Sequence, residues 1–249
     1  KEACAYFKDL EKHQFFYDFE EEDEANGQPT TYDLIDLAFN SSRADDRKTW
    51  LLTHDASSEV QVKIVETIIE GKKVLQKHIS LSDFINVNLK DFSNSDLHRS
   101  IGSLFDGLKP SQRKILYSCF KRNLKSEVKV AQLAGYVSEH AAYHNGESSL
   151  CSAIIGMAQN FIGSNNIQLL RPAGQFGTRN KGGKDAAASR YIFTCLEKIT
   201  RCLFHVDDDT LLDYLEDDGQ KIEPKYYLPI IPMVLVNGMD GIGTGWSTF

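Results

Sequence analysis

The stretch VAQLAGYVSEHAAYHNGESSLCSAIIGMAQNF (residues 130–161) contains two helical patterns separated by a polar turn. Residues 130–140 fit one helix, and apolar side chains recur at helical spacing through residues 147–161. The turn between them, with His144 and Asn145, gathers polar side chains and free amides at a helix N-terminus, a place suited to an anion. The apolar positions of the second helix are Leu150, Ile154, Ile155, Ala158 and Phe161.

An earlier helix and a later hairpin extend this pattern in both directions. Ser111, preceded by Pro110, is predicted to cap a helix. Residues 166–170 and 175–178 are predicted to be short strands around the turn at residues 172–174. Three helices and a hairpin describe a winged helix-turn-helix, in which the third helix enters the major groove of DNA. The buried face of the earlier helix would be Ile115, Leu116, Cys119 and Phe120.

The first part of the chain is less regular. Residues 1–52 are predicted to form helices around an acidic loop at residues 20–24. Residues 56–79 alternate only weakly between apolar and polar side chains, so they are predicted to be a connector that marks a domain boundary. The packing positions expected in the N-terminal helices are Leu34, Leu37, Ala38, Trp50 and Leu51.

Composition excludes several classes of protein. With 249 residues, of which 41% are hydrophobic and 25% charged, the chain can bury one large core or two modest ones. No apolar run approaches the roughly 20 residues that a membrane span needs. The five cysteines are odd in number and contain no CxxC pair, which favours reduced intracellular thiols over disulfides or a zinc site.

Charge is segregated along the chain. The net charge is -7, yet residues 98–201 contain 15 Lys and Arg against 6 Asp and Glu, which leaves 13 against 29 elsewhere. Such segregation concentrates a positive field on one part of the surface, as expected of a protein that binds the phosphate backbone. The alternative is a basic face that keeps the protein soluble or pairs with its own acidic flanks.

Tyr191 lies in the middle of the basic region, directly after Arg190. Residues 194–197 match a capping box, which places Tyr191 just outside a predicted helix. A phenol loses its proton near pKa ~10 and is a poor nucleophile at neutral pH. Neighbouring guanidinium groups favour the phenolate and stabilise charge on a phosphoryl group. From the residues alone, Tyr191 is a catalytic candidate, with packing or phosphate contact as the alternatives.

Several longer blocks carry a resemblance. They are RSIGSLFDGLKPSQRK (99–114), KVAQLAGYVSEHAAYHNGE (129–147), AQNFIGSNNI (158–167), GQFGTRNKGGKDAAASRYI (174–192) and VNGMDGIGTGWST (236–248). In this order they resemble the DNA breakage-and-rejoining core of eukaryotic-type type IIA DNA topoisomerases. A looser likeness at residues 35–51, IDLAFNSSRADDRKTWL, is similar to the tail of the metal-binding TOPRIM domain of that family.

The resemblance implies roles for individual residues. Tyr191 falls on the active-site tyrosine, which forms a 5'-phosphotyrosyl link, and Arg190 falls on the arginine that assists it. Ile242 falls on an isoleucine that wedges between base pairs, a device by which architectural proteins kink DNA. Its alternative is a plug tucked into the protein. The DNA-binding residues implied are Arg99, Lys109, Arg113, His144, Asn145 and Lys184. As ordinary solvated charges, the basic members of this set would have no such role.

One position departs from the family. Where the family has two consecutive histidines, this chain has His144 and Asn145. Asparagine donates hydrogen bonds but cannot become cationic near neutrality. Cleavage is therefore expected to be slower or less dependent on pH, and His144 is expected to be structural rather than a general base.

The resemblance also implies an architecture of the α/β (α+β) class. A helical TOPRIM tail with connector would occupy residues 1–79, a winged-helix DNA-gate domain residues 80–225, and the start of a tower domain residues 226–249. The family acts as a homodimer on double-stranded DNA, cutting a gate segment and passing a transported segment, in the nucleus. It uses Mg²⁺ and ATP, whose sites are expected outside this chain. The acidic runs at residues 207–209 and 216–218 are predicted to be surface decoration, with no metal ligand here and no membrane segment.

Two other functions stay open from the residues. The chain could be a winged-helix module that binds double-stranded DNA without chemistry, in which Tyr191 only contacts phosphate. It could also belong to another class of tyrosine transesterase, resembling a recombinase, which would leave a 3' rather than a 5' covalent link.

Overall fold

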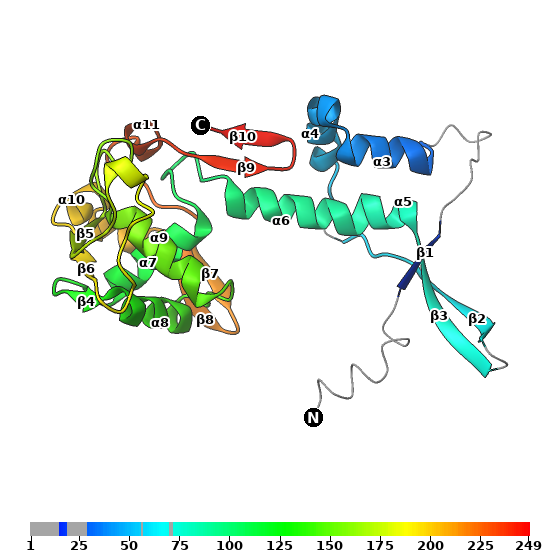
Figure 1. Cartoon of the computed structure of the whole chain (residues 1–249), viewed down its shortest axis with the longest axis horizontal. Helices are drawn as coiled ribbons and strands as arrows, with labels where there is room; N and C mark the ends of the chain where they lie inside the picture. Colours follow the sequence, from blue (N-terminus) through cyan, green and yellow to red (C-terminus); the bar gives the residue numbers. More distant parts are fainter. Residues whose placement is uncertain (1–14, 19–28, 56, 70–71) are drawn as a thin grey trace. The chain divides into compact units, whose positions relative to one another are not determined.

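The computed structural model describes residues 15–18, 29–55, 57–69 and 72–249, and the chain divides into two compact units (Figure 1). Unit 1 is formed by residues 1–97 and 243–246, and unit 2 by residues 98–242 and 247–249. We predicted boundaries after residues 79 and 225. The division falls after Leu97 instead, because Leu81, Phe84 and Leu97 pack on the N-terminal helices.

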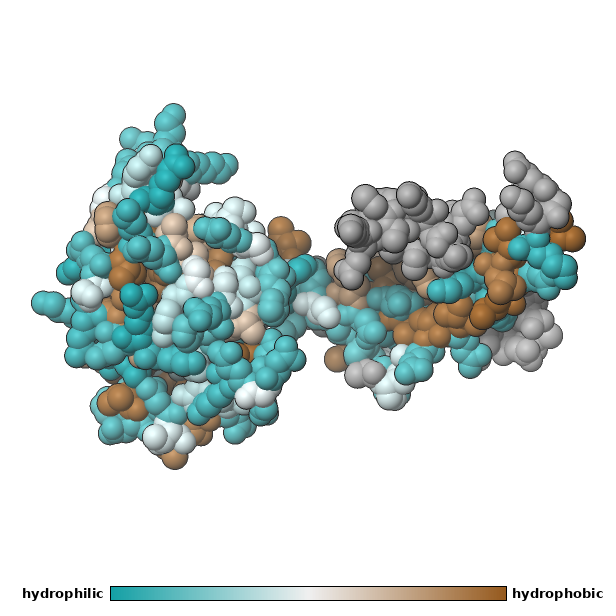
Figure 2. All heavy atoms as spheres, turned by 90° about the horizontal axis from the view of Figure 1, so that it is seen from below, coloured by the Kyte–Doolittle hydropathy of each residue, from teal (hydrophilic) through white to brown (hydrophobic). Residues whose placement is uncertain are grey.

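Unit 1 contains a three-stranded sheet in the order β1-β3-β2. The bounds are β1 Phe15–Asp18, β2 Val62–Ile69 and β3 Lys72–Ser80, with β1 parallel and β2 antiparallel to β3. The predictions of a connector at residues 56–79 and of helices alone in residues 1–52 were therefore wrong. Alternation is weak in the hairpin because apolar side chains such as Ile64 (68% exposed) and Leu75 (65% exposed) are not covered by the described residues. Figure 2 shows a band of hydrophobic residues on this unit. The acidic run at residues 20–24 lies outside the described residues.

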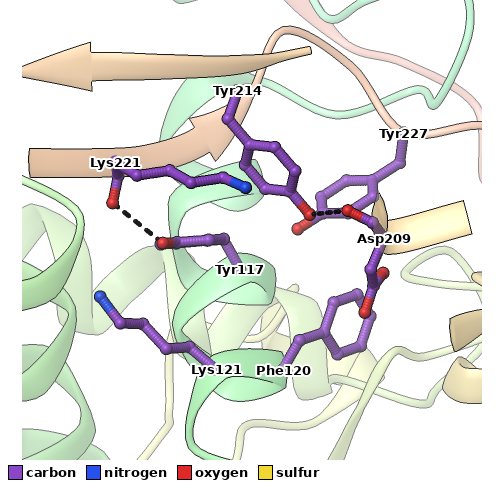
Figure 3. A pocket seen from close by; sticks show the side chains of 7 residues that line it. All are labelled: Tyr117, Phe120, Lys121, Asp209, Tyr214, Lys221 and Tyr227. Carbon is purple, nitrogen blue, oxygen red and sulfur yellow. Dashed lines mark hydrogen bonds between the residues drawn. The ribbon is translucent and has the colours of Figure 1, made fainter. Parts of the chain in front are cut away.

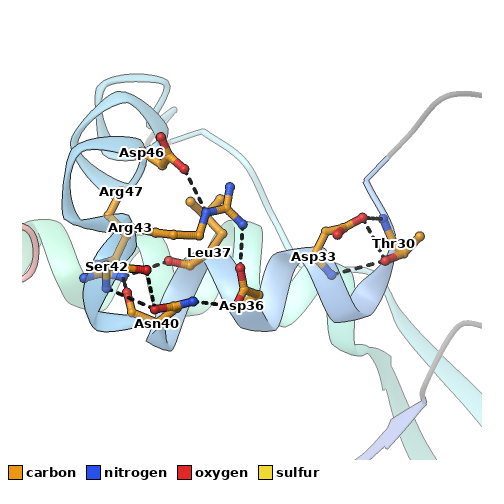
Figure 4. Close-up of polar contacts among 9 residues, drawn as sticks. All are labelled: Thr30, Asp33, Asp36, Leu37, Asn40, Ser42, Arg43, Asp46 and Arg47. Atoms are coloured by element: carbon orange, nitrogen blue, oxygen red, sulfur yellow. Dashed lines mark hydrogen bonds and ion pairs between the residues drawn. The ribbon is translucent and has the colours of Figure 1, made fainter.

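Two short helices in unit 1 are fixed by local polar contacts (Figure 4). Helix α3 (Thr31–Phe39) is capped by Thr30, whose hydroxyl accepts from the Asp33 N–H at 3.1 Å while Asp33 accepts from the Thr30 N–H. After a 3-10 turn, η2 (Ser41–Arg43), helix α4 (Ala44–Leu52) follows. Arg43 joins the two helices by ion pairs to Asp36 and Asp46.

The core of unit 1 forms between these helices and the next helical segment. That segment comprises α5 (Leu81–Asp83), the π-helical η3 (Phe84–Leu89) and α6 (Lys90–Ser100). The Trp50 indole N–H donates to Asn86, and the Lys90 ammonium lies over the Trp50 ring. As predicted, Leu34, Trp50 and Leu51 are buried and Leu37 and Ala38 pack against them.

Unit 2 is built on three helices, α7 (Pro110–Lys121), α8 (Val130–His140) and α9 (Glu147–Ala158). All three were predicted, and α8 has the predicted bounds. The cap of α7 is Lys109 rather than Ser111, because Pro110 occupies the first helical position and Gln112 accepts from the Lys109 N–H. Helix α9 ends before Phe161, because Asn165 donates to the last carbonyls of the helix.

The sheet of unit 2 differs from the predicted hairpin. Its order is β4-β6-β5, with bounds β4 Val128–Lys129, β5 Leu170–Ala173 and β6 Phe193–Leu196. Residues 175–178 are not a strand, and a long loop at residues 174–192 joins β5 to β6. The Thr194 hydroxyl donates to the Arg171 carbonyl across the sheet, so the predicted capping box at residues 194–197 was wrong.

Smaller elements complete unit 2 and its end. Their bounds are η4 Arg179–Lys181, α10 Thr200–Leu203, η5 Val206–Thr210, β7 Tyr214–Asp217, β8 Gln220–Pro224, α11 Met233–Asn237, β9 Gly241–Gly243 and β10 Trp246–Thr248. The core lies between α7, α8, α9 and the sheet. Cys119 has no exposed surface, and burial raises the pKa of its thiol to about 12, which makes it a packing residue. Within the described residues, no helix is both long enough and apolar enough to cross a membrane.

Candidate nucleic-acid interface

Tyr191 lies on the surface of unit 2, at the end of the long loop that leads into β6. Its side chain is 67% exposed. The next residue, Ile192, is 1% exposed and belongs to the core, and its carbonyl accepts from the Val130 N–H at 3.0 Å. Because neighbouring residues of an extended chain point in opposite directions, anchoring Ile192 directs Tyr191 outward. The element that follows is a strand, where a helix was predicted.

The residues before Tyr191 dock on two helices. The Arg190 guanidinium carbon lies 5.0 Å from the centre of the Tyr191 ring, and Arg190 is exposed. The Ser189 carbonyl accepts from the Ala131 N–H at 3.2 Å. Burial raises the pKa of the Cys151 thiol, against a hydrogen bond from Ser189. The first turns of α8 and α9 therefore hold the chain that presents Arg190 and Tyr191.

A cluster of cations precedes this chain, in residues 178–185, which we call the basic loop. Arg179, Lys181 and Lys184 are all exposed. The turn depends on Gly182 and Gly183, whose φ values of 58° and 78° lie in the left-handed region. The loop thus presents three positive side chains shortly before the tyrosine.

The base of the basic loop is closed by hydrogen bonds that the sequence did not reveal. The Thr178 N–H and hydroxyl donate to Oδ1 and Oδ2 of Asp185, each at 2.8 Å. These bonds lower the pKa of the Asp185 carboxyl. The Gln159 side chain donates to the carbonyls of Phe176 at 2.8 Å and Gly183 at 3.3 Å. No period in the sequence marks such pairs, so only the folded loop brings them together.

The turn before α9 carries two of the predicted DNA contacts. Asn145 is exposed, and His144 is 79% exposed with its Nε2 atom 3.6 Å from Asp217. Arg99, at the end of α6, is exposed, and its charge opposes the rise that burial causes in the pKa of Tyr143. Arg99 is therefore close to the turn that bears His144 and Asn145.

Lys109 and Arg113 differ from each other in their surroundings. Lys109 is half-buried at the start of α7. Arg113, predicted to contact DNA, is 4% exposed and donates to Asp106 at 2.8 Å and 3.0 Å and to the Leu108 carbonyl at 2.9 Å. In this structure, then, its guanidinium does not reach the surface. The reason is that Asp106 has no exposed surface, and a buried carboxylate requires a partner.

Ile242 projects from β9 with 79% of its side chain exposed. The glycines on either side explain this exposure. A Cβ atom on Gly241 would collide with the Ser100 carbonyl, and one on Gly243 would lie 2.7 Å from the Leu97 side chain. Both glycines therefore face α6 closely, and the residue between them faces away. Ile242 is not a buried plug.

An aromatic cavity of about 220 Å³ lies elsewhere in unit 2 (Figure 3). The Tyr117 hydroxyl donates to the Lys221 carbonyl and the Tyr214 hydroxyl to the Asp209 carbonyl, while the Lys221 ammonium covers the Tyr214 ring at 3.5 Å. The volume is below the roughly 300 to 1,000 Å³ of ligand sites, and these bonds tie the β7–β8 hairpin to α7. We assign the cavity a packing role. Among the residues described, no three His, Cys, Asp or Glu side chains are gathered to hold a metal ion.

Two known sequence families match the chain. Residues 99–249 match the DNA gyrase/topoisomerase IV family, and residues 1–97 match the C-terminal associated domain of TOPRIM. The two matches meet where the two compact units meet.

Individual proteins are similar over the whole chain. A probable DNA topoisomerase 2 of Dictyostelium discoideum is 56% identical, over 99% of this chain and 15% of that protein. DNA topoisomerase 2 of Saccharomyces cerevisiae is 52% identical, over 100% of this chain and 16% of that protein. The chain thus spans about a sixth of the length of these relatives.

A solved structure is also similar. It is the crystal structure of the DNA-binding, cleavage and re-ligation domain of Plasmodium falciparum topoisomerase II, with a TM-score of 0.73 and 50% identity. The likeness covers 100% of this chain and 31% of that one. Together with the two matched sequence families, these similarities show that the chain belongs to the type II DNA topoisomerase family, as a segment similar to part of the eukaryotic enzymes.

Proposed function

We propose that the chain is part of an ATP-dependent type II DNA topoisomerase that cuts and rejoins DNA through a 5'-phosphotyrosyl intermediate on Tyr191. The observation that carries this proposal is the exposed Tyr191 ring, with the Arg190 guanidinium against it and three exposed cations in the preceding basic loop. Exposure allows a backbone phosphate to approach the phenol, and the cations attract that phosphate.

The reaction is a reversible exchange of one phosphate ester for another. The phenolic oxygen of Tyr191 forms a bond to phosphorus while the bond from phosphorus to the 3'-oxygen breaks. The phenol releases its proton, and the departing 3'-oxygen gains one. Nucleophilic catalysis of this kind conserves the ester, so the strand is resealed by the reverse step.

The positive side chains stabilise this exchange in proposed roles. Arg190 would bind the phosphoryl oxygens as negative charge develops on them. Lys184 would contact the DNA backbone from the basic loop, and Asn145 would donate a hydrogen bond from the turn before α9. Arg99, Lys109 and His144 are proposed as further backbone contacts, which fix the position of the duplex without reading its sequence.

The remaining elements have proposed parts in gating. Helices α7, α8 and α9 and the sheet would act as a winged helix, and Ile242 as a wedge that bends the gate segment. Two copies of the chain in a homodimer would cut opposite strands so that a second duplex can pass, in the nucleus. ATP would be bound by other parts of the protein, as would a magnesium ion, which supplies charge neutralisation at the phosphate when bound. The match to residues 226–249 leaves the start of a tower domain as a prediction.

The test is denaturant trapping on a short duplex with magnesium, using the full-length protein. One duplex is labelled at each 5' end and another at each 3' end, and the wild type is compared with Tyr191→Phe. We expect the wild type to become covalently attached to the fragment whose 5' phosphate it holds, and Tyr191→Phe to form no adduct while still binding DNA.

Each alternative predicts a different result. A module without chemistry would bind the duplex with the same affinity in both proteins and yield no adduct from either. A recombinase-like enzyme would attach to the 3' phosphate instead. Either outcome would replace the proposed function.

A further inference from the structure

The basic loop is joined at its base by a single carboxylate. Asp185 accepts from both the N–H and the hydroxyl of Thr178, so each of its oxygens has a donor at 2.8 Å. The two residues bracket Arg179, Lys181 and Lys184. We call this pair of hydrogen bonds the clasp. It fixes the two ends of the segment that carries the cations.

Close backbone contacts hold the same path from other sides. Gly177 and Gly183 approach so closely that a Cβ atom on Gly177 would lie 2.5 Å from the Gly183 carbonyl oxygen. The Gly183 N–H donates to the Thr178 carbonyl at 2.9 Å, and Gln159 donates to the Gly183 carbonyl from the end of α9. With both ends and one side fixed, the loop has a defined place on the helix rather than a range of positions.

The path from the clasp to the tyrosine is short and is also hydrogen-bonded. The Ala187 N–H donates to the Gln175 carbonyl at 2.9 Å, and the Tyr191 N–H donates to the Ala188 carbonyl at 2.9 Å. A displacement at Asp185 is therefore passed along the backbone to Arg190 and Tyr191.

The charge of Asp185 is unfavourable for a phosphate-binding loop. It is the one acidic residue in residues 148–196, where five Lys and Arg side chains are found. If the loop acted through charge alone, this carboxylate would weaken its attraction for DNA. Its geometric role and its charge thus predict opposite effects of neutralising it.

We propose that Asp185 is a positioning residue for the reaction at Tyr191, and that its clasp with Thr178 sets the place of Lys184 and of the chain leading to Arg190. The inference rests on the proposed function. Asp185 itself does not contact DNA, and it acts through the position of the loop. Misplacement of catalytic groups by about 1 Å can cost on the order of 100-fold in rate.

The test uses Asp185→Asn in the full-length protein, with adduct formation measured at saturating duplex and DNA affinity measured separately. Asparagine removes the charge and one of the two acceptor atoms. We expect the rate of adduct formation to fall about tenfold or more. DNA affinity should stay equal or increase, because a negative charge has been removed. A rate equal to or above that of the wild type is the result expected from charge alone, and it would overturn the proposal.

A matched pair at Thr178 guards against a general effect on folding. Thr178→Ser keeps the hydroxyl that donates to Asp185, and Thr178→Val keeps the shape without it. We expect Thr178→Ser to form adduct at close to the wild-type rate and Thr178→Val to be severalfold slower at saturating DNA. Equal rates from the two would also overturn the proposal. If the wild type itself forms no adduct, the proposed function fails rather than the clasp.

Discussion

At the scale of single residues, a neighbour can decide the role of a charged side chain. Asp106 has no exposed surface and accepts from Arg113, from the Leu108 N–H and from the Tyr227 N–H at 2.9 Å. The ion pair therefore ties the loop before α7 to the segment after β8. Resemblance places Arg113 among DNA contacts, but a buried carboxylate binds it first.

Removing Arg113 should destabilise the protein. Arg113→Met leaves Asp106 buried without its cation, and breaking a buried pair in this way typically costs about 3–5 kcal/mol in free energy of unfolding. Urea unfolding of the chain measures this loss. Arg179→Met, at an exposed position of the basic loop, is the control and should change stability by less than about 0.5 kcal/mol. Equal stability of the two variants would contradict a structural role for the Asp106–Arg113 pair.

Asn145 is a second residue whose chemistry makes a testable difference. A histidine there can become cationic and would strengthen the attraction for a phosphate near neutral pH. We expect Asn145→His in the full-length protein to form as much trapped adduct as the wild type or more, with the gain largest at the acidic end of the assay range. More adduct from the wild type than from this variant would show that asparagine is the better group at this position.

At the scale of elements, β9 shows how glycines can aim a side chain. Gly241 and Gly243 lie against α6, so that Ile242 between them projects outward. This arrangement needs no special contact by the isoleucine. The close approach of two backbones is enough.

Gly241→Ala should separate β9 from α6. Its new Cβ atom would meet the Ser100 carbonyl, which is part of the backbone and cannot rotate away. We expect a loss of about 1–3 kcal/mol in the free energy of unfolding, measured by urea denaturation. Gly135→Ala is the matched control, since nothing lies within 4 Å of that position in α8, and it should stabilise the helix by about 0.5–1 kcal/mol. A neutral effect of Gly241→Ala would show that β9 moves freely.

The same scale shows what the sequence could predict. The helices of unit 2 were predicted because their apolar residues repeat at helical spacing, as Leu150 and Ile154 do in α9. Strands β5 and β6 were misplaced, because the loop of residues 174–192 separates partners that only the fold brings together. The β2–β3 hairpin was missed because both polar and apolar side chains are exposed on it.

The candidate site was predicted only in part. Tyr191, Arg190 and Ile242 came from the resemblance, and the structure places all three side chains at the surface. The clasp between Thr178 and Asp185 was missed because a threonine and an aspartate at this spacing carry no periodic signal.

At the scale of the whole molecule, charge is divided much as the chain is divided. The basic region begins at residue 98, where unit 2 begins, although the chain as a whole carries a net charge of -7. A protein that neutralises phosphates releases counterions, so its affinity for DNA falls as salt rises.

This division predicts a salt dependence that belongs to unit 2. Lys184→Ala in the full-length protein should reduce the slope of log affinity against log salt by about 1, because one phosphate contact is lost. Lys63→Ala, an exposed lysine of β2 in unit 1, should leave the slope unchanged. The measurement is a series of duplex titrations at increasing salt. Equal slopes for Lys184→Ala and the wild type would remove the basic loop from the proposed interface.

The most direct test of the account is to identify the atom that carries the DNA. Adduct trapped from the full-length protein is digested with nuclease and trypsin, and the modified peptide is sequenced by mass spectrometry. We predict a nucleotide on the phenolic oxygen of Tyr191, attached through its 5' phosphate, in the tryptic peptide YIFTCLEK or its extension across Arg190. A nucleotide on any other residue, or one attached through its 3' phosphate, would contradict the account.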